Sequence, residues 1–149
     1  MCIRDSFTPG RRNLHRGGQG VILLADDDRA ARTLTAGALA PLGQELRVAD
    51  TGQAAIEALE TDPAIRLLLL DWNMPRGHGR DVLGYVRGDE RLRAMPVIVV
   101  TTSEAERDRT EAERLGVEGY VHKSPDFDAF ERKLLAAVSP CLEGASAGR

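Results

Sequence analysis

The chain has 149 residues, of which 42% are hydrophobic and 29% are charged, and its formal net charge at pH 7 is −3. This length and composition are typical of one soluble globular domain, and the small negative charge argues against general binding to nucleic acid or to anionic membranes. No apolar run approaches the roughly 20 residues that cross a bilayer, and Cys2 and Cys141 match no metal or disulfide spacing, so we predict a cytoplasmic protein.

The N-terminal segment lacks hydrophobic periodicity and is rich in Arg and Gly, which predicts a disordered leader over residues 1–19. It also lacks the apolar segment of a secretory signal. The first six residues, MCIRDS, read like a translated sequencing-adapter end, so we interpret residues 1–6 as non-native. We expect the folded domain to cover residues 20–138, with a short flexible tail over 139–149.

The first part of this domain alternates short apolar segments with amphipathic ones. VILLA (21–25) predicts a buried strand, and apolar residues at helical spacing predict a helix over 29–41. ELRVA (45–49) predicts a second strand, and Thr51 can cap a helix that continues to Glu60. Each helix follows its strand directly, which is the pattern of consecutive β-α units.

The same alternation continues along the chain. RLLLL (66–70) is the most apolar predicted strand, and a helix is expected over 80–88. PVIVV (96–100) is rich in β-branched residues, as is typical of a central strand, and a very polar helix is expected over 104–115.

The fifth unit consists of EGYV (118–121) and an amphipathic helix from Phe127 to Val138. Five β-α units in strict alternation, with continuously apolar strands, favour a parallel sheet that is covered on both faces. We therefore predict an α/β fold with a doubly wound, five-stranded parallel sheet and five helices.

Polar residues follow four of the five predicted strands. Asp26 and Asp27 follow the first strand, Asp71 the third, Thr101 the fourth and Lys123 the fifth. We expect these side chains to converge, because ligands of open α/β sheets bind at the carboxyl ends of the strands. Three carboxylates in one crevice need protons or a cation, and carboxylates without His or Cys favour Mg²⁺. A hydroxyl, an ammonium group and Mg²⁺ around one aspartate indicate phosphoryl transfer onto that carboxylate.

Four segments that contain these residues, ILLADDD, LLLLDWNMP, PVIVVTTS and GYVHKSPD, resemble the receiver domain of two-component response regulators in their order and intervals. The resemblance covers about residues 20–138. The segments RGDERLRAMPVIVVTTS and SPDFDAF are most similar to small stand-alone regulators of the phytochrome-associated type. The resemblance implies the flavodoxin-like strand order 2-1-3-4-5.

The resemblance also implies roles for the acidic residues. Asp71 is expected to be the phosphoacceptor, Asp27 to bind Mg²⁺ directly, and Asp26 to act mainly through a bound water. Asn73 is expected to offer its backbone carbonyl to the metal. Because Trp72 follows Asp71 directly, we expect its ring at the rim of the metal site.

Three further residues have roles that the resemblance implies. Thr101 is expected to bond a phosphoryl oxygen and to move on activation, and Lys123 to pair with the phosphoryl charge. Tyr120 is expected to be an aromatic switch that turns inward when Thr101 moves, although a plain half-buried strand aromatic fits equally well. Ser124 stands where the family has a proline after a cis peptide, which leaves the Lys123–Ser124 bond open to either isomer.

The implied function is a phosphorylation-driven signalling switch, not an enzyme. It takes a phosphoryl group from a histidine kinase or phosphotransfer protein and changes its binding to an output protein, as a monomer or a phosphorylation-dependent homodimer. One alternative is a receiver fragment of a larger regulator or hybrid kinase. Another is an aspartyl-phosphate phosphatase, although Asn73 stands where such enzymes carry a general-acid aspartate. The kinase, the signal and the output protein stay open.

Overall fold

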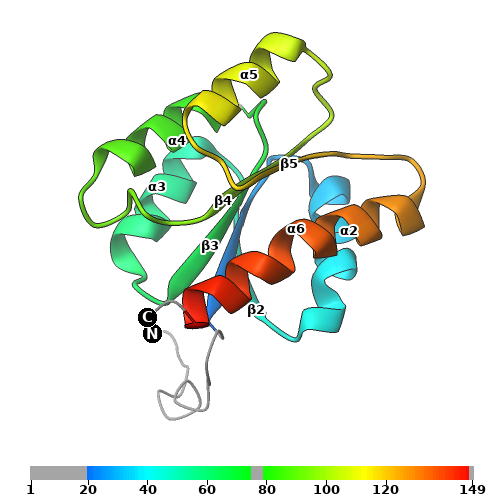
Figure 1. Cartoon of the computed structure of the whole chain (residues 1–149), viewed down its shortest axis with the longest axis horizontal. Helices are drawn as coiled ribbons and strands as arrows, with labels where there is room; N and C mark the ends of the chain where they lie inside the picture. Colours follow the sequence, from blue (N-terminus) through cyan, green and yellow to red (C-terminus); the bar gives the residue numbers. More distant parts are fainter. Residues whose placement is uncertain (1–19, 75–78, 148–149) are drawn as a thin grey trace.

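A five-stranded parallel sheet with the strand order β2-β1-β3-β4-β5 forms the centre of the molecule (Figure 1). The computed structural model describes residues 20–74 and 79–147, with side chains described as far as residue 142. The predicted leader over 1–19, including residues 1–6, lies outside the described residues. The observed sheet confirms both the predicted fold class and the strand order that the family resemblance implied.

The strands are short and nearly as predicted. They are β1 (Val21–Ala25), β2 (Glu45–Ala49), β3 (Ile65–Leu70), β4 (Val97–Thr101) and β5 (Gly119–His122). The bounds of β1 and β2 match the prediction, β3 begins one residue earlier, and β4 and β5 are each shifted by one residue toward the C-terminus. The central strand β3 lies between β1 and β4, and its residues Leu67–Leu70 are fully buried. This position explains why β3 is apolar throughout.

Five α-helices lie within the described ranges. They are α2 (Arg29–Leu39), α3 (Gly52–Thr61), α4 (Gly79–Gly88), α5 (Glu106–Arg114) and α6 (Phe127–Ala147), and the 3₁₀ helix η1 (Ala40–Leu42) continues α2. Asp28 caps α2 by accepting a hydrogen bond from the Ala30 N–H at 2.9 Å. Thr51 caps α3, as predicted, by accepting from the Ala54 N–H at 3.0 Å. These side chains satisfy backbone donors that a helix N-terminus leaves free.

The last helix is longer than expected. The prediction that it ends at Val138 is wrong, because α6 continues through the segment 139–147 that we expected to form a flexible tail. Pro140 lies inside the helix and removes one backbone hydrogen bond. Leu142 extends the apolar stripe by one turn and is buried in the same core cluster as Val138. Burial of Leu142 therefore favours a helix that the proline alone would end.

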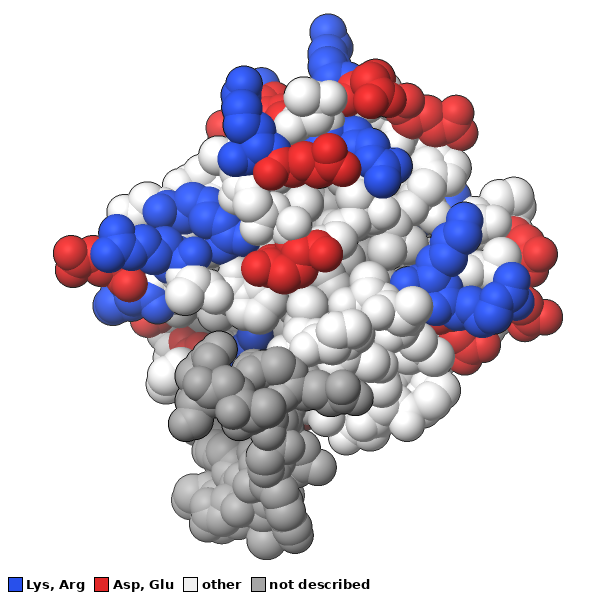
Figure 2. Space-filling view, in the orientation of Figure 1, with Lys and Arg blue, Asp and Glu red and all other residues white. Residues whose placement is uncertain are grey.

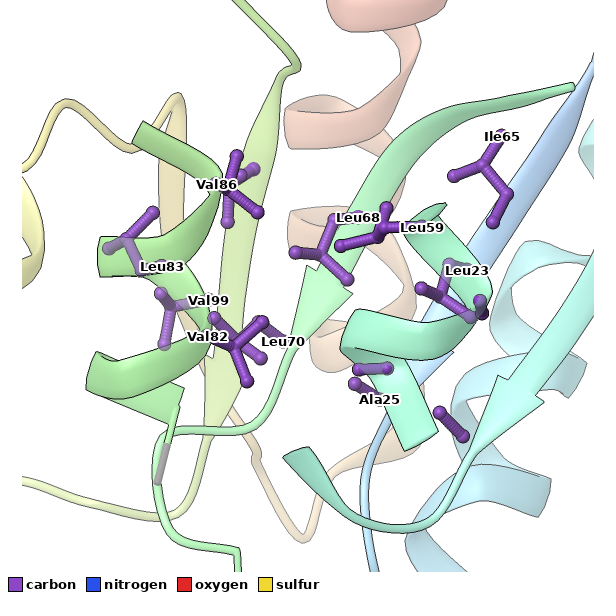
Figure 3. Close-up of a cluster of buried hydrophobic side chains, with 14 of the residues drawn as sticks. Leu23, Ala25, Leu59, Ile65, Leu68, Leu70, Val82, Leu83, Val86 and Val99 are labelled. Atoms are coloured by element: carbon purple, nitrogen blue, oxygen red, sulfur yellow. The ribbon is translucent and has the colours of Figure 1, made fainter. Parts of the chain in front are cut away.

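Two hydrophobic clusters cover the two faces of the sheet. Side chains of α3 and α4 pack on one face, and side chains of α2 and α6 pack on the other, with the helices arranged accordingly in Figure 1. Alternate residues of β3 contribute to the two clusters, Leu68 and Leu70 to the first and Leu67 and Leu69 to the second. Figure 3 shows Leu70 of the first cluster beside Val82 of α4, and Leu68 beside Leu59 of α3. Burial on both faces explains the continuously apolar strands.

None of the helices in the described part of the chain combines the length and the hydropathy that a bilayer crossing requires.

Candidate functional site

The predicted site residues meet at the carboxyl edge of the sheet. Backbone hydrogen bonds of the sheet continue into this edge: the Asp26 N–H donates to Ala49 O at 3.0 Å, and the Asp71 N–H donates to Ala25 O at 2.9 Å. The N–H of Lys123, directly after β5, donates to the carbonyl of Thr101, the last residue of β4, at 2.9 Å. The sheet itself therefore fixes the main chain on which the polar side chains are carried.

Three carboxylates form the centre of the site. Oxygen atoms of Asp26, Asp27 and Asp71 all lie within 4.8 Å of one another. Asp26 and Asp71 are buried and Asp27 is exposed, so the cluster opens to solvent on the Asp27 side. Asn73, which also belongs to the predicted metal site, donates its N–H to Asp71 Oδ1 at 3.3 Å. The convergence of the acidic residues agrees with the expectation, whereas the part that the Asn73 carbonyl plays stays a prediction.

Lys123 lies between two of the carboxylates. Its Nζ is 2.7 Å from Asp26 Oδ2 and 3.7 Å from Asp71 Oδ2, and its side chain is 15% exposed. The ammonium group therefore interacts with Asp71 while its short hydrogen bond goes to Asp26. No peptide bond of the described residues is cis, so the Lys123–Ser124 bond is trans.

The environment of Asp71 disfavours its charge. Burial raises the pKa of Asp71 from 3.8 to about 6, with the Asp26 charge acting in the same direction and Lys123 opposing both. One lysine does not compensate three clustered carboxylates. The donor set is made of hard oxygen atoms, which suits Mg²⁺ and leaves positions for water. The site therefore fits a divalent cation held by these three aspartates.

Thr101 is fully buried and belongs to a hydrogen-bonded loop. Its Oγ1 accepts from the Ser103 N–H at 3.1 Å, and the Ser103 hydroxyl donates to Asp108 Oδ2 at 2.6 Å. Ser103 therefore links Thr101 to α5, which carries Asp108.

Tyr120 of β5 is half-buried near this loop. Its hydroxyl is buried and has no hydrogen-bond partner within the described ranges, and burial raises the pKa of Tyr120 above its usual range. The Arg109 guanidinium lies over the ring, 5.3 Å from its centre, a geometry in which the cation and the ring attract each other. The switch role and the plain structural role of Tyr120 both stay predictions.

Two side chains of this edge differ from the expectation. Trp72 is only 3% exposed and packs in the hydrophobic cluster with α3 and α4, so the prediction that its ring lies at the rim of the metal site is wrong. Arg32 was missed: its Nη1 donates to the Asp26 carbonyl at 2.9 Å. A basic residue one turn into the helix that follows the acidic cluster is the sequence signal that could have identified it.

This arrangement can accept a phosphoryl group. The Asp71 carboxylate can act as a nucleophile, and the ammonium of Lys123 lies close enough to interact with charge that arrives there. A hydrogen bond from the Thr101 side chain acts to lower the pKa of Asp71. The other two carboxylates of the cluster can bind a cation, which phosphoryl transfer commonly requires.

Known proteins with the same pattern are response regulators. Residues 22–135 match the family model of the response regulator receiver domain. The chemotaxis protein CheY of Pseudomonas aeruginosa is 42% identical over 115 residues, which cover 76% of this chain and 91% of the relative. CheY1 of Helicobacter pylori is 33% identical over 114 residues, which cover 76% of this chain and 92% of that protein.

Solved structures agree with this match. The Mn²⁺-bound form of response regulator Rcp1 superposes with a TM-score of 0.75 at 32% identity, covering 83% of this chain and 95% of the other. The phosphorylated cyanobacterial phytochrome response regulator RcpA superposes with a TM-score of 0.77 at 28% identity, covering 85% of this chain and 96% of the other. Phytochrome response regulators are thus among the structural neighbours, as the sequence predicted. The chain belongs to the response regulator receiver domain family.

Proposed function

We propose that this chain is a phosphoacceptor response regulator in which Asp71 receives a phosphoryl group from a histidine kinase or phosphotransfer protein. The observation that carries this proposal is the placement of one buried carboxylate, Asp71, 3.7 Å from the Lys123 ammonium and within 4.8 Å of two other carboxylates. Such a site provides a nucleophile and compensating positive charge in the same place.

The transfer is a substitution at phosphorus. An oxygen of the Asp71 carboxylate forms the new P–O bond, while the bond from phosphorus to the donor nitrogen of phosphohistidine breaks and its electron pair returns to the imidazole. Lys123 pairs with the incoming phosphoryl oxygens, which requires that its hydrogen bond to Asp26 be exchanged. Thr101, buried at the end of β4, offers a hydroxyl donor to the same oxygens.

Mg²⁺ is the cation that we propose for this site. The side chains of Asp26, Asp27 and Asp71 would hold it, with Asp26 acting mainly through a bound water and Asn73 adding its backbone carbonyl. The bound ion supplies positive charge to the phosphoryl oxygens. The mixture of hard oxygen ligands and one solvent-facing carboxylate supports this choice.

The partners follow from this chemistry. The donor is a histidine kinase or phosphotransfer protein, the output is a protein whose binding changes on phosphorylation, and the regulator works as a monomer or a phosphorylation-dependent homodimer in the cytoplasm. Nucleic acid is not proposed as a partner: the net charge is −3, and Figure 2 shows both signs of charge interspersed on the face in view.

We propose a switch and not an enzyme, because an aspartyl phosphatase needs a general-acid aspartate at the position of Asn73. The relatives named above, which are response regulators, support this function over the phosphatase alternative.

Acetyl phosphate tests the proposal, because it can donate a phosphoryl group without a kinase. With MgCl₂, we expect the intact mass of the chain to rise by one phosphate, through a P–O bond to Asp71 and release of acetate. Asp71→Asn should abolish the gain, because the amide is a poor nucleophile. Asp28→Asn should keep it, because Asn caps a helix as well as Asp does. Labelling of the Asp71→Asn variant, or no labelling of the parent chain, would overturn the assignment.

A further inference from the structure

Gly79, the first residue of α4, approaches the backbone of the phosphoacceptor position very closely. A Cβ atom built on Gly79 would lie 2.6 Å from the Asp71 carbonyl oxygen and 2.7 Å from Trp72 Cα, whereas real Cβ contacts are essentially never shorter than 3.0 Å. The Gly79 N–H donates to the Trp72 carbonyl at 2.9 Å. Both neighbours are main-chain atoms, which cannot rotate away as the end of a side chain can.

The chain that follows Asp71 is held on its other side by the core. Trp72 and Met74 are 3% and 4% exposed and belong to the same hydrophobic cluster as Val82 and Leu83 of α4. The main chain at Asp71 thus lies between the sheet, to which its N–H bonds, and the first turn of α4. Displacing that turn requires either a shift of the Asp71 main chain or the loss of buried contacts.

We propose that Gly79 is a positioning residue for phosphoryl transfer. Because it has no side chain, α4 packs directly on the backbone of Asp71 and Trp72, and this contact sets where the Asp71 carboxylate lies relative to Lys123. The inference rests on the proposed function. A methyl group at residue 79 would displace the carboxylate by several tenths of an ångström or more, and a misplacement of about 1 Å can slow a reaction by about 100-fold.

The other glycines of α4 provide a matched control. Gly84 and Gly88 have nothing within 4 Å of the position that a Cβ would take, so alanine fits there and favours the helix. We therefore compare Gly79→Ala with Gly84→Ala. The two substitutions add the same atoms to the same helix, and only the first meets the backbone of Asp71.

Three readouts separate positioning from folding. With acetyl phosphate and MgCl₂, Gly79→Ala should be phosphorylated at least tenfold more slowly than the parent, whereas Gly84→Ala should stay within twofold. Calorimetric titration should show weaker Mg²⁺ binding for Gly79→Ala only. The emission of Trp72, the single tryptophan, should change in Gly79→Ala without phosphodonor and stay unchanged in Gly84→Ala.

Leu83→Ala shows whether loss of stability alone slows phosphorylation. Leu83 is fully buried in α4, so this variant should melt at a lower temperature but keep its phosphorylation rate within threefold under conditions where it is folded. An equal loss of rate in Leu83→Ala would overturn the inference. Phosphorylation of Gly79→Ala at the same rate as the parent would also overturn the inference. If the parent is not phosphorylated at all, the proposed function is overturned instead.

If Gly79→Ala does not fold, amide hydrogen exchange on the parent chain tests the inference in place of this variant. If α4 packs on Asp71 and sets its carboxylate, then Mg²⁺ binding at Asp71 should slow exchange of the Gly79 N–H at least threefold. The Gly84 N–H, in the same helix and away from the site, should exchange at the same rate with and without the ion. Equal exchange of the Gly79 amide in both conditions would overturn the inference.

Discussion

Asp71 is a buried carboxylate whose charge the fold disfavours. Its side chain is about 9% exposed, and burial together with the Asp26 charge raises its pKa to about 6 although Lys123 acts in the opposite direction. In the unfolded chain the same carboxyl ionises near pH 4. Ionised Asp71 therefore lowers the free energy of unfolding at neutral pH, and this penalty is absent where both states are protonated.

The first prediction concerns the stability of Asp71→Asn without divalent cations. Above pH 6 the variant should be more stable than the parent by about 1–3 kcal/mol, because two pKa units correspond to nearly 3 kcal/mol. As the pH falls from 6 to 4 the difference should decline to near zero, because the folded parent takes up a proton there. Lys123 keeps its hydrogen bond to Asp26 in the variant. Urea unfolding in EDTA across this pH range measures the effect.

Asp28→Asn is the control for this series, because Asn is an equally good helix cap and Asp28 is exposed. Its stability difference from the parent should vary little between pH 4 and pH 7. An Asp71→Asn variant that is less stable than the parent at pH 7 would show that the ionised carboxylate is better compensated than its burial indicates.

The identities of the site residues were largely predictable, and their contacts were not. Polar residues directly after apolar strands identified Asp26, Asp71 and Lys123, because parallel strands bring their carboxyl ends to one edge. The sequence could not show that Lys123 bonds Asp26 more closely than Asp71, since that depends on side-chain geometry. The close approach of Gly79 was also missed, because it arises from the packing of α4 on a loop.

At the level of elements, one arginine joins α4 to the segments around it. The Arg87 side chain donates to the carbonyls of Leu115 and Gly116 at the end of α5, both at 2.8 Å. It also donates to Arg93 O at 3.1 Å and to Met95 O at 2.8 Å in the segment before β4. Some of these carbonyls are acceptors that the end of a helix leaves free. One guanidinium thus connects three segments of the chain: α4, the end of α5 and the segment before β4.

The second prediction is that Arg87→Met lowers the free energy of unfolding by about 2–3 kcal/mol. The reason is that four carbonyls lose a charged donor, and the hydrogen bonds to two of them, Leu115 O and Met95 O, are partly buried. Arg91→Met is the matched control: Arg91 is 64% exposed and pairs with Asp89 on the surface, an interaction worth less than about 1 kcal/mol. Urea unfolding of both variants measures the two changes in the free energy of unfolding. Equal changes would mean that the Arg87 contacts contribute no more to stability than a surface ion pair.

The bounds of most elements could be read from the sequence, and the exceptions have physical reasons. β1 matches because its apolar run ends at polar residues, and α3 begins directly after its predicted cap Thr51. The end of α6 was missed because the predicted apolar stripe stopped at Val138, whereas Leu142 continues it and is buried. Local rules predict where a helix can end, but the buried surface that a longer helix gains appears only in the folded chain.

For the whole molecule, the acidic cluster connects cation binding to global stability. Asp26, Asp27 and Asp71 follow the ends of two different strands, β1 and β3, and nothing keeps them together in the unfolded chain. A cation that binds only the folded state raises the free energy of unfolding by an amount that depends on its concentration. The ion should also remove the penalty that clustered negative charge imposes on the fold.

The last prediction is that MgCl₂ raises the melting temperature of the chain above that measured in NaCl of equal ionic strength. At a tenfold excess over Kd the ion adds about 1.4 kcal/mol, which corresponds to roughly 3–6 °C for a domain of this size. Asp27→Ala should lose this increment, because it removes a proposed ligand that is exposed and costs little to delete. Asp28→Ala should melt lower throughout, since it removes the cap of α2, yet keep the full increment. Differential scanning calorimetry distinguishes the two adjacent aspartates, and an increment that survives in Asp27→Ala but disappears in Asp28→Ala would place the metal ligand at Asp28.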